Sequence, residues 1–266
     1  MRELLQRFLA EERITEFGAL PLDHVNIIHP HLLPKDVKTV IVLVVPYDNG
    51  DLYSDGISSY AHVKDYHRYF QELFDRLLPK FKSIYPNETF YGFADHSPIA
   101  EKDASAKAGL GIIGCHSLFV HPRYGSYVFI GSILTSMEFD CKIHEINHCN
   151  ACGKCQSACP VSAIEDGKIN PAQCLSAISQ KKNLSDEELT LLRQHHTAWG
   201  CDVCQSVCPY NINRSFTDIP YFIKERHDLF SVQEIANMDD REFSQYTFSW
   251  RGKKRILQNL QNLIEE

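Results

Sequence analysis

Apolar residues recur with two different periods in the N-terminal half of the chain, and the pattern predicts an α/β unit. Val37–Val45 is a mostly apolar, β-branched run, as expected for a strand buried on both faces. Asp65–Lys82 carries its apolar residues at a helical spacing. Thr89–Ala94 is predicted to be a short strand, and Glu101–Ala108 a short helix that Gly109 closes.

Two further patterns complete the expected elements. His116–Val120 and Ser126–Thr135 are predicted to pair as strands around a turn at 122–125. The C-terminal segment carries an amphipathic helical stripe, expected to cap the core, made of Ile256, Leu257, Leu260, Leu263 and Ile264. We therefore expect an α/β (α+β) domain over residues 1–140, a cysteine-rich module over 141–215 and a helical tail over 216–266 that packs on the core.

Composition and charge narrow the class of protein. The chain has 266 residues, 44% of them hydrophobic, and no apolar run reaches the length of a membrane helix. Met1–Ile14 is amphipathic with acidic residues, unlike a signal peptide, so we expect a cytoplasmic protein with no membrane partner. The net charge of −7 offers no general attraction to nucleic acid, and the basic groups Lys181-Lys182 and Lys253–Arg255 are expected to be solvated faces.

The cysteines are concentrated in one segment. Eight of the ten fall between Cys149 and Cys208. The first run, Cys149-x2-Cys152-x2-Cys155-x3-Cys159-Pro160, has the spacing of a bacterial ferredoxin. Two-residue gaps bring three thiolates onto one cubane, while the fourth cysteine lies a helical turn away and is expected to bind the neighbouring cluster.

The second run lacks one cysteine of that motif, and a cysteine between the two runs restores the number. Cys201-x2-Cys204-x3-Cys208-Pro209 needs one more thiolate, which Cys174 is expected to supply. The predicted ligands of the first 4Fe-4S cluster are Cys149, Cys152, Cys155 and Cys208. The predicted ligands of the second are Cys159, Cys174, Cys201 and Cys204.

Zinc and disulfides account for the cysteines less well than clusters do. Zinc accepts four thiolates, but zinc ribbons use paired CxxC units and need no third cysteine two residues further on. Disulfides are disfavoured in a reducing compartment. Cys115 and Cys141 lie outside the pattern, and Cys141 is expected to be an ordinary thiol. Two clusters imply an electron path, so the preceding α/β region should hold what they reduce.

The segment from Phe93 to Gly114 is the candidate active site of that region. Asp95 follows a strand and precedes a turn at Ser97-Pro98, so its carboxylate is expected at a strand end, where sites collect. A cap or Asx-turn is the usual role of such an aspartate. Tyr66-His67 would by itself be a partly buried helix surface.

Four sequence blocks together resemble the epoxyqueuosine reductases over about residues 37 to 260. They are ISSYAHVKDYHRYF (57–70), ADHSPIAEKDASAKAGLGIIG (94–114), HPRYGSYVFIGSILT (121–135) and the cysteine module. The tail segment Arg251–Leu260 is also similar to the family's. The resemblance implies a cobalamin-binding-type N-terminal domain, reduced by the two clusters, and reduction of the epoxide of epoxyqueuosine in tRNA to the alkene of queuosine.

The resemblance also implies roles for single residues. Asp95 matches the catalytic acid of the family's D-x-x-P block, and a partly apolar cleft is expected to raise the pKa of its carboxyl. The residues expected at the corrin or the substrate are Tyr66, His67, Ser97, Gly109, Gly111, Gly114 and His116. The glycines would let the backbone lie against the macrocycle. The expected electron donor is a ferredoxin or flavodoxin.

Two departures from the family pattern bear on the substrate. The family usually continues its G-x-x-G block with Lys-Asn, where this chain has Cys115-His116. His116 is then a replacement hydrogen-bond donor, a ligand on the cobalt side or a structural histidine. Longer members add a C-terminal helical-repeat domain that helps hold tRNA, so tRNA binding here is expected to be weak, supplied by a partner or absent. The alternatives are therefore a reductase of another small substrate, or a non-catalytic electron carrier or corrinoid-activating partner.

Overall fold

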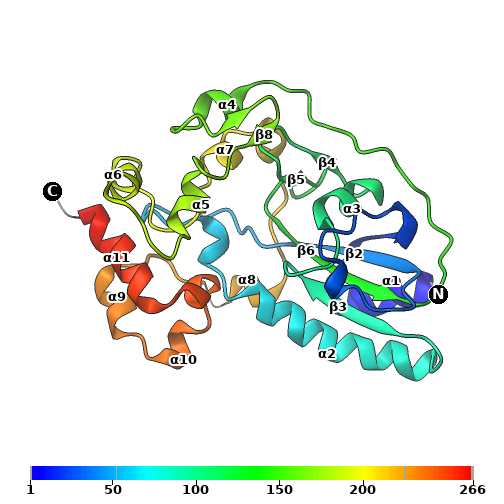
Figure 1. Cartoon of the computed structure of the whole chain (residues 1–266). Coiled ribbons are helices and arrows are strands. Elements are labelled where there is room, and N and C mark those ends of the chain that lie inside the picture. The colour runs from blue at the N-terminus through cyan, green and yellow to red at the C-terminus, as the bar shows by residue number, and fades with distance from the viewer. Residues whose placement is uncertain (1, 52, 225, 265–266) are drawn as a thin grey trace.

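A four-stranded antiparallel sheet forms the core of the N-terminal part of the computed structural model, which describes residues 2–51, 53–224 and 226–264 (Figure 1). The strands lie in the order β1 (Glu16–Pro21), β2 (Thr39–Pro46), β6 (Val128–Thr135) and β3 (Phe90–Ala94). Every residue of β2 is buried, which confirms the buried strand predicted from its apolar run.

Both faces of this sheet are covered by helices, and alternate residues of β2 serve the two faces. Ile41 and Leu43 belong to the cluster that packs under α1 (Arg2–Glu11) and α2 (Tyr66–Ile84). Val40 and Val42 belong to the cluster on the other face, where α3 (Glu101–Lys107) lies. Burying each such side chain stabilises the fold by about 1.5–3 kcal/mol. The mixed α/β prediction for this part of the chain is confirmed.

The ends of α2 and α3 are set by local chemistry. The Asp65 side chain accepts a hydrogen bond from the backbone N–H of His67 and so caps the start of α2. Gly109, with φ +78°, follows the end of α3, where the left-handed backbone favours glycine. Both helices lie within two residues of their predicted bounds.

The predicted pairing of His116–Val120 with Ser126–Thr135 is wrong. Instead, β5 (Phe119–Val120) pairs with β4 (Ile112–Ile113) in a separate ribbon. β6 inserts between β2 and β3 and pairs with both along the central sheet. The apolar alternation located the strands, but the eight-residue β6 buries more surface inside the sheet than it could beside a two-residue neighbour.

The cysteine-rich segment is built from short elements above the sheet in Figure 1. In chain order they are α4 (Lys154–Ala158), β7 (Ile164–Glu165), β8 (Lys168–Ile169), α5 (Leu175–Ser179), α6 (Asp186–Gln194) and α7 (Val203–Ser206). Its largest buried apolar group is small, consisting of Leu175, Ile178 and Leu192. Such a segment needs support from elsewhere, as bound groups or neighbouring elements provide.

The tail is helical, as predicted. Its helices are α8 (Pro220–Ile223), α9 (Val232–Asn237), α10 (Asp240–Phe243) and α11 (Lys253–Ile264). In α11, Ile256 and Leu260 are buried, whereas Ile264 is 72% exposed and does not take part in the predicted stripe. Leu257 and Leu263 are partly buried and pack against the same apolar cluster as Ile256 and Leu260, so the rest of the predicted stripe faces the core.

Trp199 joins the three predicted parts of the chain in one apolar cluster. It is completely buried, and its indole N–H donates to the hydroxyl of Tyr60 across 2.8 Å. Ile57 from the first part and Phe248 and Ile256 from the tail share the cluster. The tail therefore packs on residues of both other parts. Within the described residues, no helix has the length and apolar character needed to cross a membrane.

Candidate active site and cluster sites

Two cavities in the cysteine-rich segment are each lined by the four cysteines predicted for one cluster, and Cys115 also lines the first of them. The first, the Cys149 cavity, is lined by Cys149, Cys152, Cys155 and Cys208. The second, the Cys174 cavity, is lined by Cys159, Cys174, Cys201 and Cys204. The structure thus brings together the two groups of four expected from the spacing. As expected, Cys208 of the second run lies in the first cavity and Cys159 of the first run lies in the second.

The loop that carries the first run has two left-handed residues. Ala151 has φ +51° and Gly153 has φ +77°. Backbone of this kind bends a short loop tightly and turns successive N–H groups inward. Cys155 then sits in α4, and Cys159 follows the end of that helix and joins the other cavity.

The thiols surround cavities and do not converge on a point. Among the residues that the structure describes, no group of three or more His, Cys, Asp or Glu side chains is arranged to hold a single metal ion. A 4Fe-4S cluster takes four thiolates around a group of several atoms. Four cysteines around an enclosed space therefore fit the group that the spacing predicts.

The two cavities are adjacent. Burial raises the pKa of Cys204 to about 12, with further contributions from Cys201 and Cys174 and from Cys155 of the first cavity. The helix that carries Cys155, α4, also contacts the helix that carries Cys204, α7. This proximity suits the passage of electrons between two clusters.

A third cavity, of about 530 Å³, opens beside the end of β3 and contains Asp95; we call it the Asp95 pocket. Its walls include Tyr66 from α2, Glu101 from α3 and Phe129 from β6. Gln180, which follows α5 of the cysteine-rich segment, completes it. The pocket therefore lies where the sheet meets the cysteine-rich segment, at the strand end that the sequence predicted.

Asp95 adopts an uncommon backbone conformation. Its φ is +62°, in the left-handed region that disfavours most side chains but that aspartate tolerates. The N–H of Ser97 donates to the Asp95 carbonyl across 2.8 Å and closes the turn. Strained backbone of this kind persists where the surroundings hold it, and it is frequent at active sites.

Asp65, His67 and Asp95 form a chain of side chains. The Nδ1 atom of His67 lies 2.7 Å from an Asp65 carboxylate oxygen, and its Nε2 atom lies 3.3 Å from an Asp95 oxygen. Burial alone would lower the pKa of His67, but the two carboxylates outweigh it and raise that pKa to about 9. The imidazole is therefore protonated at neutral pH and holds a proton beside Asp95.

The expected direction of the Asp95 pKa is wrong. The hydrogen bond from His67 lowers the pKa of the Asp95 carboxyl, and this effect outweighs the burial that would raise it. The side chain of Asp95 is 66% exposed, so it does not lie in the apolar cleft expected from the sequence. The proton between the two groups therefore lies on the His67 imidazole, and the Asp95 carboxylate accepts the hydrogen bond.

Glu101 is a functional candidate that the sequence reasoning missed. Burial raises the pKa of its carboxyl to about 8, and the negative charge of Asp95 adds to the effect. The hydroxyl of Ser132 donates to it across 3.3 Å. In the sequence, Glu101 is a carboxylate at the start of a predicted helix, six residues after Asp95, and this position by itself does not indicate a function. Glu101 lines the Asp95 pocket, so its carboxyl is a candidate to hold a second proton there.

The other residues predicted to touch a cofactor divide into two groups. Tyr66 lies in the Asp95 pocket, where its ring stacks on that of Phe129 with centroids 4.3 Å apart. Ser97 is fully buried beneath the pocket, and its hydroxyl lies 3.5 Å from that of Ser132. The Tyr66 ring also stacks on that of His67, with centroids 4.0 Å apart, so Tyr66 lines the pocket as part of a packed group of rings. Ser97 supports the turn that carries Asp95.

The glycines of the G-x-x-G block lie elsewhere. A side chain at Gly109 would meet His144, one at Gly111 would meet Val120 and Phe119, and one at Gly114 would meet His116. These glycines therefore make room for neighbouring protein atoms. The structure does not bring them to the Asp95 pocket, so the expectation that their backbone lies beside a flat ligand there has no support.

His116 does not line the Asp95 pocket either. It is buried, and it lines the Cys149 cavity together with Cys115. Burial lowers the pKa of the imidazole. The backbone N–H of Cys115 donates to the sulfur of Cys149 across 3.3 Å. The replacement of the family's Lys-Asn pair thus falls beside a predicted cluster.

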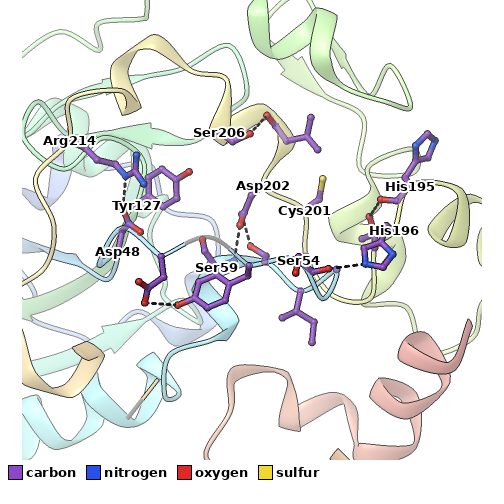
Figure 2. A pocket seen from close by; sticks show the side chains of 18 residues that line it. Asp48, Ser54, Ser59, Tyr127, His195, His196, Cys201, Asp202, Ser206 and Arg214 are labelled. Carbon is purple, nitrogen blue, oxygen red and sulfur yellow. Dashed lines mark hydrogen bonds and ion pairs between the residues drawn. The ribbon is translucent and has the colours of Figure 1, made fainter. Parts of the chain in front are cut away.

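A further pocket lies where residues 48–59 meet the cysteine-rich segment (Figure 2). Within it, the Asp202 carboxylate accepts hydrogen bonds from the Ser58 hydroxyl across 2.6 Å and from the Ser59 N–H across 2.7 Å. Asp202 follows Cys201 directly. These bonds fix one cysteine of the Cys174 cavity to the chain that precedes α2.

Comparison with known families places these observations in a class. Residues 148–211 match the family model described as a 4Fe-4S double cluster binding domain. Together with the two four-cysteine cavities, this match makes the chain a double-cluster iron–sulfur protein. Residues 28–96 match the model described as epoxyqueuosine reductase QueG, DUF1730.

Curated relatives identify the family. An epoxyqueuosine reductase of Listeria monocytogenes is 30% identical in an alignment 276 residues long, which covers 94% of this chain and 71% of that protein. One of Bacillus subtilis is 31% identical over 74% of this chain and 52% of its own length. The chain belongs to the epoxyqueuosine reductase family. It spans between about half and three quarters of the length of these relatives.

Solved structures share the fold. An epoxyqueuosine reductase of Streptococcus thermophilus superimposes with a TM-score of 0.79 at 23% identity, over 99% of this chain and 80% of that one. An epoxyqueuosine reductase in complex with an epoxyqueuosine-modified tRNA-Tyr stem loop gives a TM-score of 0.83 at 23% identity, over 99% and 81%. The arrangement of sheet, cysteine-rich segment and tail is therefore that of these proteins.

Proposed function

We propose that this chain is an iron–sulfur reductase that removes the epoxide oxygen of epoxyqueuosine, with Asp95 in the proton-donating group. One observation carries the proposal: the chain combines two adjacent four-cysteine cavities with a pocket that holds proton carriers. Such a reduction consumes electrons, which clusters in the cavities would deliver, and protons, which groups of the pocket would deliver. The named relatives share both the sequence and the fold.

The cysteine groups are the proposed cluster ligands. Cluster 1 is held in the Cys149 cavity and cluster 2 in the Cys174 cavity. The two 4Fe-4S clusters, when bound, supply electrons one at a time. A one-electron carrier such as a ferredoxin or flavodoxin is the proposed source. Cys152, a proposed ligand of cluster 1, is exposed.

The Asp95 pocket is the proposed site of cobalamin and substrate. Cobalamin, when bound, would supply a redox-active cobalt centre through which electrons reach the substrate. The stacked rings of Tyr66 and Phe129 and the side chain of Gln180 line a space open enough for part of a large, flat group. Tyr66 and His67 are the residues that would meet it from α2.

The titratable groups in and beside the Asp95 pocket are the proposed source of the protons that the reaction consumes. Conversion of an epoxide to an alkene breaks two C–O bonds, forms one C=C bond and releases the oxygen as water, consuming two electrons and two protons. His67 holds one proton against Asp95, which is positioned to pass it to the departing oxygen. Glu101, whose pKa is about 8, holds the other.

Two structural relatives support the details. One is described as having its catalytic aspartate loop swung out of the active site, and it shares the fold with a TM-score of 0.82. Asp95 lies on the loop between β3 and α3, with the left-handed backbone described above. Another contains a modified tRNA stem loop. We infer that the substrate of this chain is the epoxide within tRNA, and on that basis we propose a cytoplasmic location.

The substitution Asp95→Asn separates an enzyme from an electron carrier. Asparagine keeps the size of the side chain but cannot pass a proton, so epoxide reduction is expected to fall about 100-fold or more. Cluster content and cluster reduction by an external donor should be unchanged. Equal turnover by the variant would contradict the enzymatic mechanism, while a non-catalytic carrier would show no epoxide reduction in either form.

A further inference from the structure

His116 has one ring nitrogen whose role is defined by the backbone. The side chain is 1% exposed, and its Nδ1 atom accepts a hydrogen bond from the N–H of Leu118 across 3.2 Å. An imidazole nitrogen that accepts a hydrogen bond carries no hydrogen. The hydrogen of this neutral ring must therefore be on Nε2.

That Nε2–H group has no acceptor among the described residues. The Nε2 atom of His116 is buried and makes no hydrogen bond to the protein. Leaving a buried donor unpaired costs about 1–3 kcal/mol, and buried polar groups are nearly always paired. The site therefore calls for an acceptor that the polypeptide does not provide.

The Cys149 cavity provides the place for that acceptor. His116 lines it together with the four cysteines assigned to cluster 1. The backbone N–H of Cys115 already donates to the Cys149 sulfur in the same cavity. Sulfur atoms of a cluster and its thiolates accept N–H hydrogen bonds, which tune its potential.

We propose that His116 is a positioning residue for electron transfer, whose Nε2–H donates a hydrogen bond to a sulfur of cluster 1 and raises its reduction potential. The inference rests on the proposed cluster site. Reduction adds one electron, and the negative charge that arrives strengthens a hydrogen bond to sulfur, so the reduced form is stabilised more than the oxidised form. The proton stays on His116 throughout.

His121 is a matched control within the same chain. It is buried too, and its Nδ1 atom accepts from the N–H of Arg123 across 3.2 Å, the same i to i+2 pattern. Its Nε2 atom, however, lies 3.3 Å from the Glu16 carboxylate. His121 therefore has its acceptor in the protein and is absent from the Cys149 cavity.

The test is a potentiometric titration of both clusters in the full chain, followed by electron paramagnetic resonance. In His116→Leu, one of the two midpoint potentials should shift to a more negative value while the other stays in place. His116→Gln, which keeps an N–H donor, should restore part of the shift. His121→Leu should leave both potentials unchanged. Iron content confirms that both clusters are present in each variant.

A second measurement needs no substitution of the histidine. Pulsed resonance on the reduced chain with 15N-labelled histidine should show a weak coupling between one ring nitrogen and cluster 1. Unchanged potentials in His116→Leu with full iron content, or no coupling in the labelled chain, would overturn the inference. A chain that never binds clusters would instead overturn the proposed function, so the two failures are distinguishable.

Discussion

The imidazole of His67 links the carboxylates of Asp65 and Asp95, which are 30 residues apart in the sequence. Its two ring nitrogens lie 2.7 Å and 3.3 Å from their oxygens. Asp65 is also the N-cap of α2, so the residue that caps the helix also orients the His67 ring. A proton is thereby stored next to the residue proposed to deliver it, and a carboxylate behind the ring orients it as in catalytic triads.

Stability should depend on pH through His67. Its pKa in the folded chain is about 9, above the ordinary value of 6.5, so its stabilising contribution is fully present below about pH 6.5 and is lost as the pH rises through 9. Urea unfolding at pH 6 and pH 9.5 measures this. The decrease between the two pH values should be smaller in His67→Gln than in the unsubstituted chain. His31 is exposed, so His31→Gln should behave like the unsubstituted chain. An equal decrease in all three proteins would contradict a stabilising interaction of His67 with Asp65 and Asp95.

Cys174→Ser should damage one cluster and spare the other. Cys174 is the residue recruited from outside both runs to complete its cavity. Iron content is expected to fall from about eight to about four atoms per chain when one 4Fe-4S cluster is lost. Cys141→Ser, which lies in neither four-cysteine cavity, should retain the full content. Full iron content in Cys174→Ser would show that another ligand completes the second cluster.

Glu101→Gln should remove the second proton carrier of the Asp95 pocket. Loss of a proton donor of this kind slows turnover by about 100-fold, and Glu101→Asp should recover part of it. Infrared difference spectra between pH 6 and pH 9.5 provide an independent readout. The unsubstituted chain should lose a carboxylic acid band with a midpoint near 8 that Glu101→Gln lacks.

The groups that face Glu101 affect this titration. Those lining the same pocket are Tyr60, Tyr66, Asp95, Lys102 and Asp103. Because the Asp95 charge helps to keep Glu101 protonated, Asp95→Asn should lower the midpoint of the band. Glu138→Gln, an exposed carboxylate away from this pocket, is the control for both readouts. A band that survives in Glu101→Gln would refute the assignment.

Asp202→Ala should destabilise the contact between the cysteine-rich segment and the chain before α2. It leaves the Ser58 hydroxyl and the Ser59 N–H without their acceptor. The expected loss is about 2–4 kcal/mol of the free energy of unfolding, from two unpaired, partly buried donors. Anaerobic urea titration measures it, and the exposed Asp140→Ala should change it by less than about 0.5 kcal/mol. Similar values for both variants would mean that these bonds contribute little.

Local motifs in the sequence predicted the cysteine groups and the position of Asp95. The grouping of Cys174 with Cys201 required only a count of thiols, because a cluster takes four. A strand followed by a Ser-Pro turn likewise placed Asp95 at a strand end. In both cases the relevant information lies within a short stretch or in a ligand number.

Pairings across long separations could not be predicted in this way. The lowered pKa of Asp95 depends on His67, which lies 28 residues earlier and on another element. The neighbours of β6 depend on the closure of the whole sheet. The glycines Gly111 and Gly114 resemble a ligand cradle in sequence, but in the fold they accommodate neighbouring atoms of the protein itself.

The most direct test of the account is epoxide reduction by the unsubstituted chain. The protein would be purified without oxygen, reconstituted with iron, sulfide and cobalamin, and given a chemical one-electron reductant and a tRNA stem loop that carries epoxyqueuosine. Mass spectrometry of the released nucleosides should show queuosine, with the loss of one oxygen atom per substrate. If the chain carries both clusters in reduced form with cobalamin bound and leaves the epoxide intact, the central claim is contradicted.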